Sequence, residues 1–93
     1  MSNLEKLRQQ IDKIDKRLLE VLSERFKVAR KIGIFKEKHN LPVCDKKREK
    51  DIFRKRNLQA QKLKLDPVLV EKIFKLIIEK VKENHKAIKN SKK

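Results

Sequence analysis

The sequence predicts an all-α fold of three helices, and both its composition and its hydrophobic pattern support this prediction. The 93 residues include one glycine and two prolines, whereas 44% are charged residues. Turn-forming residues are therefore too few for a sheet with several hairpins, and the abundant charged residues favour helices. Apolar residues also recur every three or four positions over long segments, which is the period of a helix. A chain of this length is expected to form a single domain spanning residues 1–93.

The first predicted helix is longer than the domain that should contain it. Ser2 and Glu5 have the spacing of a capping box, and no proline follows before Pro42, so the helix should run from about residue 3 to 38. Its apolar stripe consists of Leu4, Leu7, Ile11, Ile14, Leu18, Leu22, Val28, Ile32 and Phe35. Such a helix is roughly 50 Å long, whereas a compact domain of this size is roughly 30 Å across. The excess stripe predicts packing against a second copy, as in a symmetric homodimer.

The second helix is predicted by an aspartate that follows the first turn. Residues 39–47 contain this turn, and Asp45 is a favourable N-cap. The helix should run from about residue 46 to 63. The side chains expected to face inward are Ile52, Phe53, Ala60 and Leu63.

The third helix is predicted by Asp66 and Pro67, an N-cap followed by proline at the first helical position. It should run from residue 67 to about 88. The side chains expected to face inward are Val70, Ile73, Phe74, Ile77, Ile78, Val81 and Ile88. Residues 89–93 are polar and basic, and we expect a frayed tail there.

The charge of the chain favours a negatively charged partner. Lys and Arg number 28 against 13 Asp and Glu, which gives a net charge of +15. Nucleic acid is one such partner, but 21 of the basic residues are lysines spread along every helix, with no aromatic side chain among them suited to stacking and no zinc-binding spacing. We therefore favour a small anionic substrate over nucleic acid.

The cellular location is predicted from the lone cysteine and from the apolar segments. Cys44 cannot form an internal disulfide, which is typical of a reducing cytosol. The first residues lack the basic start and apolar block of a secretory signal, and no apolar run reaches membrane-spanning length. We expect a cytoplasmic domain without membrane contact.

Two cationic residues lie on the apolar stripe of the first helix. Arg25 and Lys36 are eleven positions apart, so they lie within about 20° of each other around the helix and roughly 16 Å apart along it. Burying two unpaired cations is costly, and an anion should therefore meet them. For Arg25, in the middle of the stripe, this pattern favours a functional role. For Lys36, near the helix end, a solvated side chain explains the position equally well.

Arg8 lies at the flank of the same stripe but far from the other two cations. It is 28 residues from Lys36, which is about 42 Å on a straight helix. Both residues cannot touch one small ligand within one chain. If they serve one site, Arg8 must come from a partner subunit.

Other charged residues have ordinary explanations when each is taken alone. Asp45, Arg48 and Glu49 are a helix cap, a solvated base and a first-turn acid. His85 lies on the stripe of the third helix, where a lone histidine is usually a helix-end residue that reaches water.

Taken together, these segments resemble the all-helical (AroQ-type) chorismate mutases. The resemblance is carried, in order, by residues 7–15 (LRQQIDKID), Leu18-Leu19, Glu24-Arg25, Ile32-Gly33, Lys36, residues 41–45 (LPVCD), Arg48-Glu49, residues 65–67 (LDP) and residues 73–79 (IFKLIIE). The match covers about residues 4 to 88. It implies an intertwined homodimer that converts chorismate to prephenate, without a cofactor, in the biosynthesis of phenylalanine and tyrosine.

The resemblance also implies roles for the cationic residues. Arg8 would be lent across the dimer to hold a substrate carboxylate. Arg25 and Arg48 would bind carboxylates within one chain. Lys36 would donate to the ether oxygen and to a carboxylate. Arg25 and Lys36 would thereby act directly in catalysis.

Four further residues complete the implied site. Asp45 and Glu49 match positions around the ring hydroxyl of the substrate. Val81 departs from the family pattern, in which this position is often polar, such as Ser. His85 stands where the family usually has Gln, the second donor to the ether oxygen, and a histidine ring can also donate there.

Two other functions remain open at this point. An isochorismate-pyruvate lyase on the same fold would use a similar cationic pocket. A non-catalytic basic helical binding module would need no cation on a buried face, so Arg25 favours an enzyme. The rearrangement itself is unimolecular and needs no nucleophile, metal or redox centre.

Overall fold

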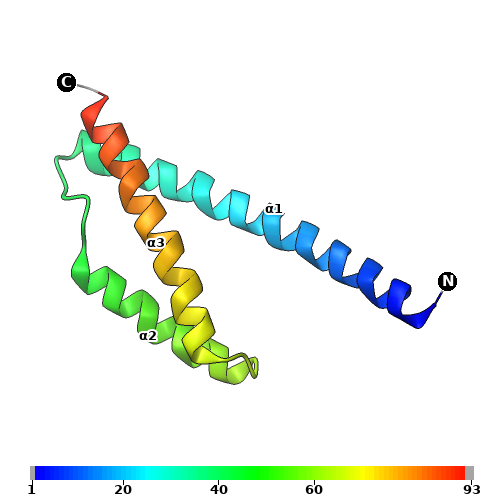
Figure 1. The fold of residues 1–93 in the computed structure, drawn as a ribbon. Coiled ribbons are helices and arrows are strands. Elements are labelled where there is room, and N and C mark those ends of the chain that lie inside the picture. The colour runs from blue at the N-terminus through cyan, green and yellow to red at the C-terminus, as the bar shows by residue number, and fades with distance from the viewer. Residues whose placement is uncertain (1, 92–93) are drawn as a thin grey trace.

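A computed structural model describes residues 2–91, and the chain forms three α-helices (Figure 1). These are α1 (Asn3–Lys38), α2 (Lys46–Lys62) and α3 (Pro67–Asn90). The predicted all-α class is confirmed; α2 ends one residue earlier than expected, and α3 continues two residues further, into the expected tail. Residues 92–93 of that tail lie outside the described residues. Within the described residues, no helix has the combination of length and apolarity needed to cross a membrane.

Each helix begins where the sequence supplies a side-chain cap. The three predicted N-cap side chains each accept a backbone N–H of the first turn: Ser2 from Glu5 at 3.2 Å, Asp45 from Arg48 at 3.0 Å, and Asp66 from Val68 at 2.9 Å. Caps of this kind each stabilise a helix by about 1 kcal/mol. The starts of the three helices are therefore fixed by contacts between residues that are close in the sequence.

Helix α3 holds the fold together because it packs against both other helices. Among the described residues, α1 and α2 make no close backbone approach to each other. The buried apolar side chains are few and mostly small: Ala29, Ile52, Ala60, Val70 and Ile78. The predictions that Leu63 and Ile73 face inward are wrong, since these side chains are 70% and 45% exposed. Leu63 is exposed because it is the C-cap residue, where α2 ends. Ile73 is exposed because the apolar residues of α3 extend around more of the helix than α1 and α2 cover.

The N-terminal half of α1 extends beyond the rest of the chain (Figure 1). The Cα radius of gyration is 17.0 Å, against about 12 Å expected for a compact domain of this length. The apolar stripe on this half is uncovered, with side chains 48–65% exposed at Leu4, Leu7, Ile11, Ile14, Leu18 and Leu19. One chain therefore leaves a long apolar surface without a partner.

The crossing of α1 and α3 depends on a glycine. Gly33 is buried, and a Cβ added there would lie 2.5 Å from Cδ2 of His85 and 3.0 Å from Cδ1 of Ile88. Since real Cβ contacts are longer, only glycine allows the two helices to approach this closely. The residue that weakens α1 in isolation is thus the one that lets α3 dock on it.

Gly33→Ala should destabilise the fold by about 1–3 kcal/mol, because the methyl group overlaps the buried imidazole of His85. The measurement is urea unfolding followed by circular dichroism at a fixed protein concentration. The control is the same change in a His85→Ala background, where the overlap with the ring is gone and alanine should not destabilise the helix. A Gly33→Ala protein as stable as the unsubstituted chain would contradict the close crossing.

Candidate functional site

A cavity of about 290 Å³ lies between the three helices and collects most of the predicted site residues. Its lining includes Arg25, Lys36, Asp45, Arg48, Glu49, Val81 and His85. These residues come from α1, from the start of α2 and from the second half of α3. Arg8 is exposed on the extended half of α1 and does not line the cavity.

Arg25 is the half-buried cation on the α1 side of the cavity. Its guanidinium Cζ lies 5.8 Å from the ring centroid of Phe74, within the range of a cation–π interaction. Burial, followed by repulsion from Arg56 and Arg48, lowers the pKa of Arg25 from its ordinary value. Among residues 2–91, no carboxylate lies within ion-pair distance of it. The site therefore holds a positive charge that the protein itself does not neutralise.

Lys36 lies further along the same wall, as the helical spacing predicts. Its Nζ donates a hydrogen bond to the carbonyl oxygen of Val43 at 3.3 Å, which ties α1 to the turn before α2. A carbonyl oxygen carries no formal charge, so the ammonium keeps two further N–H groups for an anion. Arg25 and Lys36 thus line one cavity from one face of α1.

The start of α2 brings polar residues to the opposite wall. Asp45 lines the cavity while its Oδ1 caps the helix. Arg48 is 54% exposed, and its Nη1 donates to Oδ2 of Asp51 at 3.1 Å. Hydrogen bonds from Lys55 and then Arg54 lower the pKa of Asp51. Exposed pairs of this kind are weak, so Arg48 can exchange this partner for another carboxylate at little cost.

Glu49 is held by two donors, Lys82 and Cys44, neither of which was predicted from the sequence as its partner. Its Oε1 lies 3.2 Å from Nζ of Lys82 on α3, and its Oε2 accepts from Sγ of Cys44 at 3.4 Å. The spacing of Ile78, Lys82 and His85 at i, i+4 and i+7 could have placed the lysine on the inward face of α3. The pair links α2 to α3 across the cavity and fixes the direction of the carboxylate.

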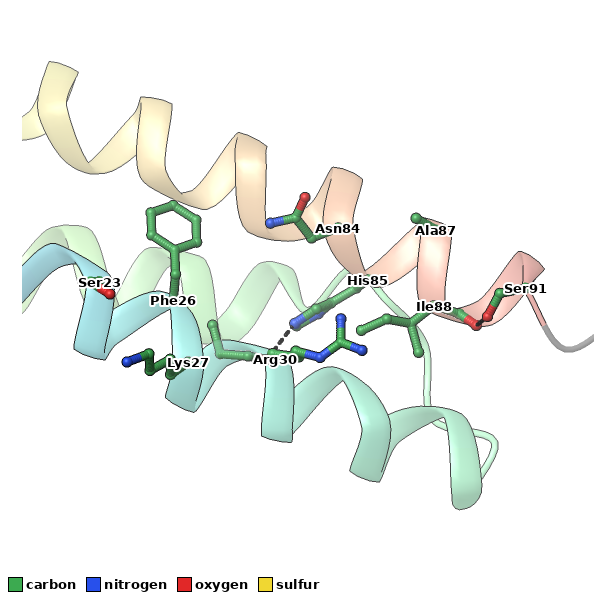
Figure 2. Close-up of a pocket in the computed structure, with 10 residues that line it drawn as sticks. Ser23, Phe26, Lys27, Arg30, Asn84, His85, Ala87, Ile88 and Ser91 are labelled. Carbon is green, nitrogen blue, oxygen red and sulfur yellow. Dashed lines mark hydrogen bonds between the residues drawn. The ribbon is translucent and has the colours of Figure 1, made fainter.

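His85 does not reach water, so the expectation for a lone helix-end histidine is wrong. Its side chain is 5% exposed, and its Nε2 lies 2.8 Å from the carbonyl oxygen of Ala29, between α1 and α3 (Figure 2). A carbonyl oxygen only accepts, so Nε2 must carry the proton. The other ring nitrogen, Nδ1, is buried without a hydrogen-bond partner among the described residues. The neutral ring can then only accept at Nδ1, and a charged ring is needed to donate there.

Apart from Lys82 and His85, the residues of α3 that line the cavity are apolar. A further arginine lines the cavity from α2. Val81 and Ile78 line the cavity without a polar group. Arg56, which the sequence analysis did not select, lines the cavity with its Cζ 5.5 Å from the ring centroid of Phe74. Arg56 lies one turn after Ile52 on α2, and this inward spacing is the signal that could have found it.

A larger hollow of about 640 Å³ also opens between α1 and α3 (Figure 2). Its charged lining consists of Lys27 and Arg30, with His85 between the helices. Among the described residues, its lining includes no acidic side chain and no residue of α2. We assign the functional site to the smaller cavity, because there cations, carboxylates and a buried histidine converge from three helices.

An all-helical domain with a small cationic cavity of this kind is built to hold a small anionic molecule. The chain belongs to the chorismate mutase type II family, whose family model matches residues 7–86. The match includes Arg8 and every predicted site residue in the cavity.

Individual relatives agree with this family. The chain is 47% identical over 55 residues to a bifunctional chorismate mutase/prephenate dehydratase of Aquifex aeolicus, covering 59% of this chain and 15% of the relative. It is 31% identical over 91 residues to a T-protein of Enterobacter agglomerans, covering 96% of this chain and 24% of the relative. It is 29% identical over 79 residues to a chorismate mutase of Methanocaldococcus jannaschii, covering 85% of this chain and 80% of the relative. The chain thus spans less than a quarter of the first two relatives and most of the third.

Proposed function

We propose that this domain is a chorismate mutase, an isomerase that rearranges chorismate to prephenate in aromatic amino-acid biosynthesis. The observation that carries the proposal is the pair of cations on α1, Arg25 and Lys36, which line one cavity and have no carboxylate at ion-pair distance among residues 2–91. The substrate is a dianion, and its two carboxylates supply the missing negative charge. Family membership gives the reaction.

The chemistry suits a site without a nucleophile. In the rearrangement, the C–O bond of the ether breaks as a C–C bond forms within the same molecule, and no atom enters or leaves. The protein has to hold the substrate in its compact conformation and stabilise the negative charge that builds on the ether oxygen. Arginine forks suit the first task because they bind carboxylates with two parallel hydrogen bonds. An ammonium group suits the second.

The proposed roles follow from the contacts in the cavity. Arg25 and Arg48 bind the carboxylates, with Arg48 exchanging its exposed contact with Asp51 for the substrate. Lys36 donates to the ether oxygen and to a carboxylate with the N–H groups that Val43 does not use. Glu49, which Lys82 and Cys44 hold in place, accepts the single proton of the ring hydroxyl, and Asp45 lies beside that hydroxyl.

We further propose that two copies form an intertwined dimer in which each supplies Arg8 to the other's site. The uncovered apolar stripe on the first half of α1 supports a second copy as its partner, because each copy carries the same stripe. Arg8 lies on this half, outside the cavity of its own chain. The free and exposed Cys44 supports a reducing compartment, the cytoplasm, as the place where the dimer works.

Arg25→Ala should lower kcat/KM for chorismate roughly a hundredfold, since it removes a charged and partly desolvated contact. This corresponds to a loss of about 3 kcal/mol of transition-state stabilisation. The assay follows loss of chorismate, with prephenate identified as the product. Arg30→Ala, an exposed change on the same helix, is the control and should keep near-normal activity. Binding to DNA or RNA should not respond to Arg25→Ala. An unsubstituted protein that releases pyruvate, or that binds nucleic acid but leaves chorismate unchanged, would overturn the proposed function.

The shared site can be tested by mixing two inactive variants. Arg8→Ala and Arg48→Ala homodimers should each be nearly inactive, whereas co-refolding them should restore activity to about a quarter of the sites, because each heterodimer contains one site with both arginines. Sedimentation should give twice the 11.2 kDa of one chain. A folded monomer, or no recovery in heterodimers confirmed by mass spectrometry, would rule out the exchange of Arg8.

His85 gives a prediction about the second donor to the ether oxygen. Because Nε2 donates to Ala29, the neutral ring has no N–H at Nδ1 to offer the substrate. His85→Gln should therefore match or exceed the turnover of the unsubstituted protein in steady-state kinetics with chorismate, because an amide always carries N–H groups. His85→Ala should be strongly impaired. A fully active His85→Ala protein would leave Lys36 as the sole donor to the ether oxygen.

A further inference from the structure

Two arginines of the cavity lining, Arg56 and Arg25, meet at one aromatic ring. The guanidinium Cζ of Arg56 lies 5.5 Å from the ring centroid of Phe74, and that of Arg25 lies 5.8 Å from the same centroid. The two arginines come from different helices, α2 and α1, and both line the cavity. Phe74, on α3, therefore holds two positive groups at one end of the site.

In the part of the chain that the structure describes, no carboxylate neutralises this pair. Within residues 2–91, neither arginine has a carboxylate at ion-pair distance, and Nη1 of Arg56 donates to the neutral amide oxygen of Gln59 at 3.1 Å. Arg54, two residues earlier on the same helix, is instead paired with Asp51 at 2.9 Å. The charge of Arg56 also contributes to lowering the pKa of Arg25, so the two groups repel each other. An anion that met both would relieve this repulsion.

Arg25 alone cannot satisfy a carboxylate in this cavity. A carboxylate has two oxygens with about four acceptor positions, and one guanidinium satisfies only part of them. On α3, Ile78 and Val81 offer no hydrogen-bond donor to the cavity, and the ammonium group of Lys82 is already paired with a carboxylate at 3.2 Å. Arg56, which meets the same ring as Arg25, can supply the further donors.

We propose that Arg56 is a substrate-binding residue, which forms with Arg25 a two-arginine clamp for one carboxylate of the dianionic substrate. The clamp rests on the proposed function, since that function supplies the dianion. Phe74 holds the two guanidinium groups in place before the substrate arrives, and the carboxylate enters between them. The clamp acts on a group that keeps its charge throughout the rearrangement.

This last property determines the kinetic signature. An interaction with a carboxylate whose charge does not change is equally strong in the bound substrate and in the transition state. Loss of such an interaction raises KM and leaves kcat nearly unchanged. Loss of a residue that only stabilises the fold instead lowers the fraction of active protein, which reduces the apparent kcat and leaves KM unchanged.

The test is steady-state kinetics with chorismate on Arg56→Ala and Arg56→Met, with Arg54→Ala as the matched control on the same helix. Both Arg56 variants should raise KM by about tenfold or more and keep kcat within about threefold. Arg56→Met keeps an aliphatic chain against Phe74, so it remains informative if the alanine variant folds poorly. Arg56→Lys should recover part of the affinity, because an ammonium restores the charge but not the fork.

The outcomes separate the clamp from the proposed function. If the unsubstituted protein converts chorismate and the Arg56 variants resemble Arg54→Ala, the clamp is wrong and the function stands. If the Arg56 variants lose kcat and thermal stability together without a change in KM, Arg56 is structural and the clamp is wrong. If the unsubstituted protein does not convert chorismate, the function fails, and the clamp fails with it.

Discussion

The close approach of α1 and α3 is the constraint on which the rest of the structure depends. Among residues 2–91, the backbones of α1 and α2 make no close approach to each other, whereas α3 packs against both, so the cavity between them depends on α3. On the α1 side, docking requires a residue without a side chain at Gly33, and the imidazole of His85 fills the space that this leaves. The hydrogen bond from His85 to the carbonyl of Ala29 then fixes the ring between the helices (Figure 2). The contacts of His85 with Gly33 and with the carbonyl of Ala29 therefore fix both the packing of α3 on α1 and the position of a polar residue that lines the site.

The helices were predictable because their signals are local. Each N-cap lies beside its helix in the sequence and needs no information about the rest of the chain. Burial was less predictable, since it depends on which helix covers which face. Leu63 and Ile73 have the correct period but lie where no second helix covers them.

Those parts of the candidate site that depend on the spacing within a single helix could be predicted from the sequence. The spacing of Arg25 and Lys36 on α1 was enough to bring both to one cavity. The inward spacing of Arg56 and Lys82 could have placed both side chains on the cavity side of their helices, but it could not reveal their partners on α3 and α2, Phe74 and Glu49. His85 was misjudged for a similar reason, because the carbonyl that binds it lies 56 residues earlier in the chain.

The uncovered stripe of α1 has a consequence for how the protein behaves on dilution. Where a second copy supplies the missing half of the core, folding and association are one equilibrium, and each tenfold fall in concentration costs the dimer about 1.4 kcal/mol. A single chain in dilute solution exposes Leu4, Leu7, Ile11 and their neighbours to water, which makes it prone to proteolysis and to aggregation. The abundance of the chain in its cell would then set how much of it is folded at all.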